Sequence, residues 1–126
     1  MANKKIFIVD DDVMLATMLA DHLRGTFPAE VVEFHTGEAC LAKLGEHPDL
    51  VILDYHLNNT VKDAADGLRI LEKIKKMDRQ VHVIMLSSQT QYGIALQTVA
   101  KGAEHYVLKG KDQFDQIDRI VKVMLA

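Results

Sequence analysis

The sequence predicts an α/β fold in which parallel strands form one sheet between two layers of helices. Short apolar runs alternate along the chain with longer stretches that have the period of an amphipathic helix. The central runs are apolar at nearly every position, as strands covered by helices on both faces should be. With 126 residues, of which 48% are hydrophobic and 26% charged, the chain has the size and composition of one globular domain.

The predicted strands are apolar runs rich in Val, Ile and Leu. They are expected at residues 5–9, 31–34, 50–53, 81–86 and 105–108. The second run, VVEF, and the fifth, HYVL, contain polar residues, which suits strands at the edges of the sheet. Right-handed crossovers then favour a flavodoxin-like (βα)5 arrangement: a doubly wound, five-stranded parallel sheet with the strand order 2-1-3-4-5 in a three-layer α/β/α structure.

Helices are predicted between the strands from apolar residues that recur at helical spacing. They are expected at residues 13–24, 38–44, 68–77, 92–101 and 112–125. Gly25 is expected to end the first helix, and Gly45 with Pro48 to end the second. Asp12 directly precedes the first helix and is expected to cap its amino end, where a carboxylate is favoured.

Composition and charge exclude several classes of protein. A net charge of −3 offers no basic surface for nucleic acid, and no apolar run is long enough to span a membrane. The amino-terminal stretch MANKKIFIVD lacks the features of a secretory signal, so a cytoplasmic protein is expected. Cys40 is the single cysteine and cannot form an internal disulfide, and its position on a predicted helix indicates a buried structural thiol.

Polar side chains follow the strands at the end where parallel sheets bind ligands. The strand ends are followed by Asp10, Asp11 and Asp12, by Asp54, by Ser87 and Ser88, and by Lys109. In the order 2-1-3-4-5 the first, third and fourth strands are neighbours, so these groups are expected to meet at one edge of the sheet. Asp and Ser also commonly cap helices, but carboxylates, a hydroxyl and an ammonium placed together indicate a functional site.

With these residues, the sequence resembles the receiver domain of two-component response regulators, the family of the single-domain chemotaxis regulators. The resemblance covers essentially the whole chain and is carried by the stretches FIVDDD, LVILDYHL, DGLRIL, VIMLSS and KGAEHYVLK. It implies one receiver domain at residues 1–126, with no output domain in this chain. It also implies a cytoplasmic phosphoprotein of a phosphorelay that turns over no external substrate and is therefore not an enzyme.

The resemblance assigns a role to each candidate site residue. It gives the acidic pair as Asp10 and Asp11, the phosphoacceptor as Asp54, the switch hydroxyl as Ser87, the switch aromatic as Tyr106 and the active-site lysine as Lys109. In such a site Asp54 would attack a phosphohistidine or a small phosphodonor, forming an aspartyl phosphate. Lys109 would offset charge on the transferring phosphoryl group.

The resemblance also implies a metal cofactor, Mg²⁺, with Mn²⁺ as an alternative. Mg²⁺ takes oxygen ligands in octahedral geometry and usually keeps some of its water. Its direct ligands would be Asp11, Asp54 and the main-chain carbonyl of His56, and Asp10 would act through the metal's water.

The same resemblance implies how a signal leaves the domain. A phosphoryl group brings nearly two negative charges, so Ser87 would swing to donate a hydrogen bond to it and Tyr106 would rotate into the vacated space. This would change the face made by the fourth helix, the fifth strand and the fifth helix. His56 and Gln89 occupy the positions that tune dephosphorylation in the family.

The implied partners are a sensor histidine kinase or phosphotransfer protein and a separate downstream protein. No direct binding of nucleic acid or membrane is expected. The chain would be a monomer, or a weak dimer through the face that carries the signal.

Three features depart from the family pattern. The loop after Asp54, YHLNNTVKDAADG, is longer than usual and has Asn58 where a proline is common, so it could form a lid or a partner epitope. Lys109 is followed by Gly110 rather than proline. A cis bond before a non-proline residue costs about 2.5–4 kcal/mol, so a trans peptide or a remodelled loop is expected there. Ser87 replaces the commoner threonine and keeps the hydroxyl.

Two other functions fit some of these residues. Asp10 and Asp12 after an apolar run give the Asp-x-Asp pattern of a haloacid-dehalogenase-type phosphatase, in which Asp10 would be the nucleophile. Against it, Met14 stands where that pattern has a threonine, and no acidic pair follows Lys109. The second alternative is a degenerate receiver used as a non-phosphorylated docking module, which the changes at Gly110 and in the long loop would allow.

Overall fold

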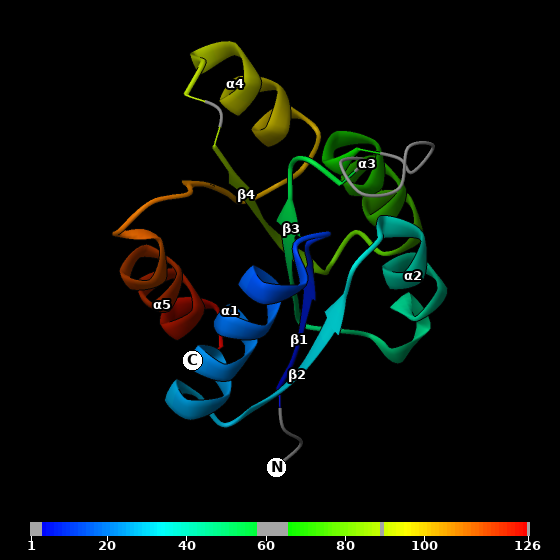
Figure 1. The fold of residues 1–126 in the computed structure, drawn as a ribbon. Helices are drawn as coiled ribbons and strands as arrows, with labels where there is room; N and C mark the ends of the chain where they lie inside the picture. Colours follow the sequence, from blue (N-terminus) through cyan, green and yellow to red (C-terminus); the bar gives the residue numbers. More distant parts are fainter. Residues whose placement is uncertain (1–3, 58–65, 89, 126) are drawn as a thin grey trace.

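The computed structural model describes residues 4–57, 66–88 and 90–125. Within these residues, parallel strands form one sheet in the order β2-β1-β3-β4-β5 (Figure 1). The strands are β1 (Lys4–Val9), β2 (Ala29–Phe34), β3 (Leu50–Asp54), β4 (His82–Ser87) and β5 (His105–Leu108). The predicted fold class, strand order and edge positions of β2 and β5 are therefore confirmed.

Helices cover both faces of the sheet, as the crossovers predict. They are α1 (Val13–Thr26), α2 (Gly37–Ala42), α3 (Gly67–Met77), α4 (Tyr92–Ala100) and α5 (Gln113–Met124), and a 3₁₀ turn, η1 (Leu44–Glu46), follows α2. Figure 1 shows α1 and α5 together on one side of the sheet and α2 and α3 on the other. Among the residues of α4 only Thr98 is buried, so this helix presents most of its surface to solvent.

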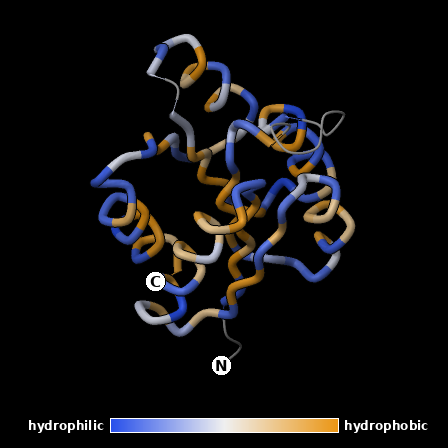
Figure 2. Tube along the Cα trace, viewed as in Figure 1, coloured by the Kyte–Doolittle hydropathy of each residue, from blue (hydrophilic) through white to orange (hydrophobic). Residues whose placement is uncertain are grey.

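Alternation of side chains along the strands produces two apolar cores, one on each face. In β1, Phe7 and Val9 join the core under α2 and α3, whereas Ile6 and Ile8 join the core under α1 and α5. Figure 2 shows the most hydrophobic segments along the middle of the sheet and hydrophilic segments on the outer parts of the helices. Burial on both faces is the reason that the central strands have nearly continuous apolar sequences.

The first two helices end two residues away from their predicted ends, and the other helices end within one residue of theirs. Gly25 does not end the first helix, because α1 continues through it to Thr26. The chain leaves the helix at Phe27, which is extended, as the residue before a proline usually is. The second helix ends at Ala42 rather than at residue 44, because the main-chain N–H of Lys43 donates to Cys40, three residues back, and the chain tightens into η1.

The predictions for Cys40 and for the peptide bond after Lys109 agree with the structure. Cys40 is fully buried, and burial raises the pKa of its thiol to about 12, so it is an unreactive core residue. The peptide bond between Lys109 and Gly110 is trans, as are all others in the described segments. No helix in those segments has both the length and the apolar character needed to cross a bilayer. Asn58 and Gln89 lie outside the described residues.

Candidate functional site

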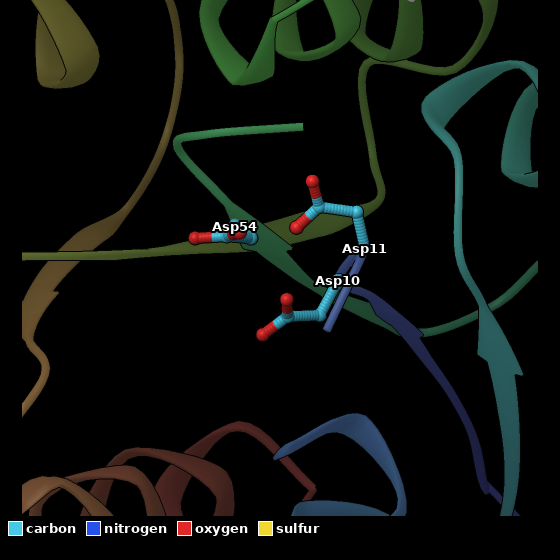
Figure 3. Close-up of side chains that lie close together, drawn as sticks. All are labelled: Asp10, Asp11 and Asp54. Carbon is cyan, nitrogen blue, oxygen red and sulfur yellow. The ribbon is translucent and has the colours of Figure 1, made fainter. Parts of the chain in front are cut away.

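Three carboxylates gather at the carboxyl ends of β1 and β3. One oxygen each from Asp10, Asp11 and Asp54 lies within 4.8 Å of the other two, and Figure 3 shows the three side chains around a common space. The sheet causes this convergence, because β1 pairs with β3 in a register that sets Val9 against Leu53, one residue before Asp10 and Asp54. The predicted meeting of these carboxylates is confirmed.

An ammonium group from the end of β5 completes the cluster. The Nζ atom of Lys109 lies 2.9 Å from Oδ1 of Asp54 and 3.7 Å from Oδ2 of Asp10. The main-chain N–H of Lys109 donates to the carbonyl of Ser87 over 2.8 Å, which fixes the chain beyond β5 against β4. The lysine therefore reaches the carboxylates although glycine, not proline, follows it.

Burial controls the protonation of the two inner carboxylates. Asp54 is 3% exposed, and this burial, together with the charge of Asp10, raises its pKa from 3.8 to about 7 against the opposing effect of Lys109. Burial also raises the pKa of Asp10, although the hydrogen bond from the N–H of Asp12 and the charge of Lys109 act in the opposite direction. Without a cation, ionised carboxylates at this site therefore carry a free-energy cost.

Lys109 responds to the same surroundings in the opposite sense. Burial alone would lower its pKa, but the hydrogen bond that it donates to Asp54 and the charges of Asp54 and Asp10 outweigh burial and raise the pKa. Lys109 is therefore charged at neutral pH, and its positive charge faces the three carboxylates.

The donor set suits a hard divalent cation. All three side chains present carboxylate oxygens, which Mg²⁺ and Mn²⁺ prefer, and Asp11 is the most exposed of the three. A cation reverses the local electrostatics, since it allows neighbouring carboxylates to ionise together. The residues present therefore fit a metal of this class.

Asp12 belongs to the helix rather than to the cluster. Its Oδ1 atom accepts a hydrogen bond of 3.2 Å from the main-chain N–H of Leu15 and caps the amino end of α1. Its own N–H donates to Oδ1 of Asp10 over 2.9 Å, so the turn that starts α1 also holds a site carboxylate in place. The predicted capping role of Asp12 is confirmed.

Ser87 and Tyr106 lie on the same face of the sheet. Ser87, at the end of β4, is fully buried. It lies two positions after Met85, and Met85 pairs with Tyr106 of β5. Tyr106 is partly buried and packs against the core under α2 and α3. The alternation along both strands thus puts the hydroxyl and the aromatic ring on one side, next to the end of β3.

His56 lies beside the site. A hydrogen bond from its main chain to Asp54 lowers the pKa of that carboxyl, although burial outweighs this effect. Its ring meets the ring of Tyr55 edge to face at 4.9 Å. Gln89, the other residue expected to tune dephosphorylation, lies outside the described residues.

The sequence predictions missed His35, which follows β2. Its Nδ1 atom lies 3.2 Å from the carbonyl oxygen of Asp10. A signal was available, because β2 is the predicted neighbour of β1 and a residue just beyond its end must lie near Asp10.

Comparisons with known proteins agree with this geometry. Residues 6–122 match the family described as "Response regulator receiver domain". The chain is 30% identical over 121 residues to the chemotaxis protein CheY of Bacillus subtilis, a match that covers 95% of this chain and 93% of that protein. A CheY-like receiver domain from Methanospirillum hungatei superposes with a TM-score of 0.85 at 25% identity, over 98% of this chain and 94% of the other. The phosphorylated cyanobacterial phytochrome response regulator RcpA gives 0.83 at 25% identity, over 99% and 96%.

Proposed function

Because the chain belongs to the response regulator receiver domain family, we propose that it is a phosphoacceptor of a two-component phosphorelay, in which Asp54 takes a phosphoryl group from a histidine kinase or phosphotransfer protein. The observation that carries this proposal is the buried carboxylate of Asp54, which forms an ion pair with Lys109 and lies within 4.8 Å of two further carboxylates. A buried acid in such surroundings has no evident structural purpose, since desolvation disfavours its charge.

In the proposed reaction the ionised Asp54 is the nucleophile. One of its carboxylate oxygens forms a bond to phosphorus while the bond between phosphorus and the donor imidazole nitrogen breaks, and that nitrogen keeps the electron pair and later takes a proton. Lys109, 2.9 Å from Asp54, is within reach of an oxygen on the arriving phosphoryl group. Its charge offsets the negative charge that gathers there, and such positioning and electrostatics supply most of the catalysis in phosphoryl transfer.

The residues that would hold the metal are Asp11 and Asp54 directly, the carbonyl of His56, and Asp10 through water. Mg²⁺ or Mn²⁺ bound there would supply a Lewis acid that offsets charge on the transferring oxygens. The chain's own contribution is to hold the carboxylates together: Asp10 is fixed by the N–H of Asp12, and Asp54 by Lys109.

The proposed output depends on Ser87 and Tyr106. Ser87 and Tyr106 lie on the same face of the sheet, and this supports the proposed output. A hydroxyl that turns toward a phosphoryl group on Asp54 vacates space beside β5, on the side where Tyr106 packs. The added charge supplies the driving force. The α4–β5–α5 face is a suitable surface for a downstream protein, or for a weak dimer, because it exposes large apolar residues such as Leu96, Val99 and Leu108.

The proposal is tested by intact mass after incubation with acetyl phosphate, with and without Mg²⁺, for the wild type and Asp54→Asn. A metal-dependent phosphoryl adduct that is absent from the variant is expected. An adduct at Asp10 with turnover of phosphate esters would favour the phosphatase instead, although membership of the receiver family argues against it. A wild type that forms no adduct and shows no response to beryllofluoride would favour the docking module.

A further inference from the structure

Two successive residues of the chain that ends β2 hold the main chain of Asp10. The N–H of Asp10 donates to the carbonyl of Phe34 over 3.0 Å, which continues the ladder between β1 and β2 by one bond. On the other side of the residue, Nδ1 of His35 lies 3.2 Å from the carbonyl oxygen of Asp10. A carbonyl oxygen can only accept, so Nδ1 carries the hydrogen and donates it.

The carbonyl that His35 holds belongs to the peptide bond between Asp10 and Asp11. That bond is planar, so fixing its oxygen also fixes the direction of its N–H and the point from which Asp11 departs. The next residue is restrained as well, because the N–H of Asp12 donates to the side chain of Asp10 over 2.9 Å. Asp11 therefore lies between two restrained peptide groups, and His35 supplies one of the restraints.

We propose that His35 is a positioning residue for the metal site: its Nδ1–H holds the Asp10–Asp11 peptide in the orientation that lets Asp11 bind a divalent cation together with Asp54. This inference rests on the proposed function, since it presupposes that a cation binds at the cluster. His35 itself touches neither the cation nor the reacting atoms. A purely structural role for the same hydrogen bond would stabilise the fold without changing the affinity for metal.

The chain allows a matched test at this position. In Asn, Nδ2 is attached to Cγ as Nδ1 is in His, so His35→Asn keeps a donor near the same place. His35→Leu has the same branching at Cγ and no donor. His35 is exposed, so both variants are expected to fold. Mn²⁺ affinity is measured from the electron paramagnetic resonance signal of the free ion, and the Mg²⁺ dependence of acetyl phosphate labelling is measured alongside.

His35→Leu is expected to weaken Mn²⁺ binding about threefold to tenfold, or about 0.7–1.4 kcal/mol at 1.4 kcal/mol per factor of ten. His35→Asn should remain within about twofold of the wild type, because it keeps the hydrogen bond. At saturating Mg²⁺ the labelling rate of His35→Leu should equal that of the wild type, because only the affinity for the metal has changed. Thermal unfolding in EDTA should be similar for all three proteins.

The inference is overturned if His35→Leu binds Mn²⁺ as tightly as the wild type, or if both variants lose affinity equally. It is also overturned if the loss of affinity is matched by a loss of stability in EDTA. If the wild type binds Mn²⁺ and is labelled on Asp54, and His35→Leu behaves identically, only the inference about His35 is refuted and the proposed function stands. A wild type that neither binds Mn²⁺ nor becomes labelled refutes the proposed function, and the inference with it.

Discussion

Replacing Asp54 with asparagine is expected to stabilise the protein at alkaline pH when no divalent cation is present. Asp54 is 3% exposed, and burial together with the charge of Asp10 raises its pKa from 3.8 to about 7. Between these values the native state binds a proton that the unfolded state has lost, so stability is highest below about pH 4 and falls as the pH rises through about 7. Asparagine keeps the shape of the side chain and removes this loss.

The size of the effect follows from the rise in the pKa of Asp54. A rise in pKa from 3.8 to about 7 corresponds to a cost of up to about 4 kcal/mol for the ionised group, at about 1.4 kcal/mol per unit of pKa. This cost is already net of Lys109, whose hydrogen bond and charge favour the ionised carboxylate and lower its pKa. The gain is therefore expected to be at most about 4 kcal/mol at pH 8, a rise in Tm of up to about 15 °C for a domain of this size.

Thermal and urea unfolding in EDTA at pH 8 and pH 5 test this prediction. At pH 5 the gain should shrink, because Asp54 of the wild type is then protonated. Adding Mg²⁺ at pH 8 should stabilise the wild type and have little effect on Asp54→Asn. Asp21→Asn is a suitable control, since Asp21 is exposed and should change stability by no more than about 0.5 kcal/mol. A variant that is less stable than the wild type at pH 8, or whose advantage grows at pH 5, would show that ionisation of Asp54 does not destabilise the native state.

Three further substitutions test the supporting structure. Gly67→Ala should destabilise the protein by at least about 2 kcal/mol in urea, because a Cβ atom there would lie 2.5 Å from a main-chain oxygen at the end of β3. Asp12→Ala should lose about 1 kcal/mol by removing the cap of α1, and Asp12→Asn should recover most of it. Glu104→Gln should lose about 1–2 kcal/mol at pH 7, because Glu104 accepts hydrogen bonds from the N–H of Val83 and from Lys75. Burial alone would raise the pKa of Glu104, but these bonds outweigh it and lower the pKa, so their stabilisation is lost as the pH falls below about 4.5 and the variant's deficit should shrink in acid.

Each of these predictions has a result that would contradict it. Gly25→Ala is the control for the glycine variant: Gly25 lies inside α1 with open space around it, so alanine should stabilise by about 0.5–1 kcal/mol. Equal effects of alanine at Gly67 and Gly25 would be inconsistent with the close approach at Gly67. Equal losses for both Asp12 variants would argue against capping. A deficit of Glu104→Gln that stays constant from pH 7 to pH 3 would show that its charge is not involved.

The sequence allowed the site to be predicted wherever it depends on the ends of strands. Apolar runs identify buried parallel strands, and the strand order then follows from which runs contain polar residues. Once β1 and β3 are neighbours, Asp10 and Asp54 must meet, because each follows its strand directly. The capping role of Asp12 could also be predicted from the sequence, since it depends only on one side chain and the helix that begins beside it.

The strand order indicates which residues lie near the site, but it does not indicate how a side chain rotates toward a partner that is distant in sequence. His35 bonds to Asp10, 25 positions earlier, only because its ring turns toward β1. His22 pairs with Asp118 at 2.8 Å and stacks on Phe114, which joins α1 to α5 across 96 positions. The end of α1 was mispredicted at Gly25 for a different and local reason. Glycine allows a helix to end without requiring it, and the chain leaves this helix only at Phe27, before the following proline.

Locating the modified residue decides whether Asp54 carries the phosphoryl group. Borohydride reduces an aspartyl phosphate to homoserine, so the protein is treated with acetyl phosphate and Mg²⁺, reduced, digested and mapped by mass spectrometry. Homoserine is expected at position 54 in the wild type, dependent on Mg²⁺ and absent in EDTA. Homoserine at position 10 or 11 with Asp54 unmodified would contradict this expectation.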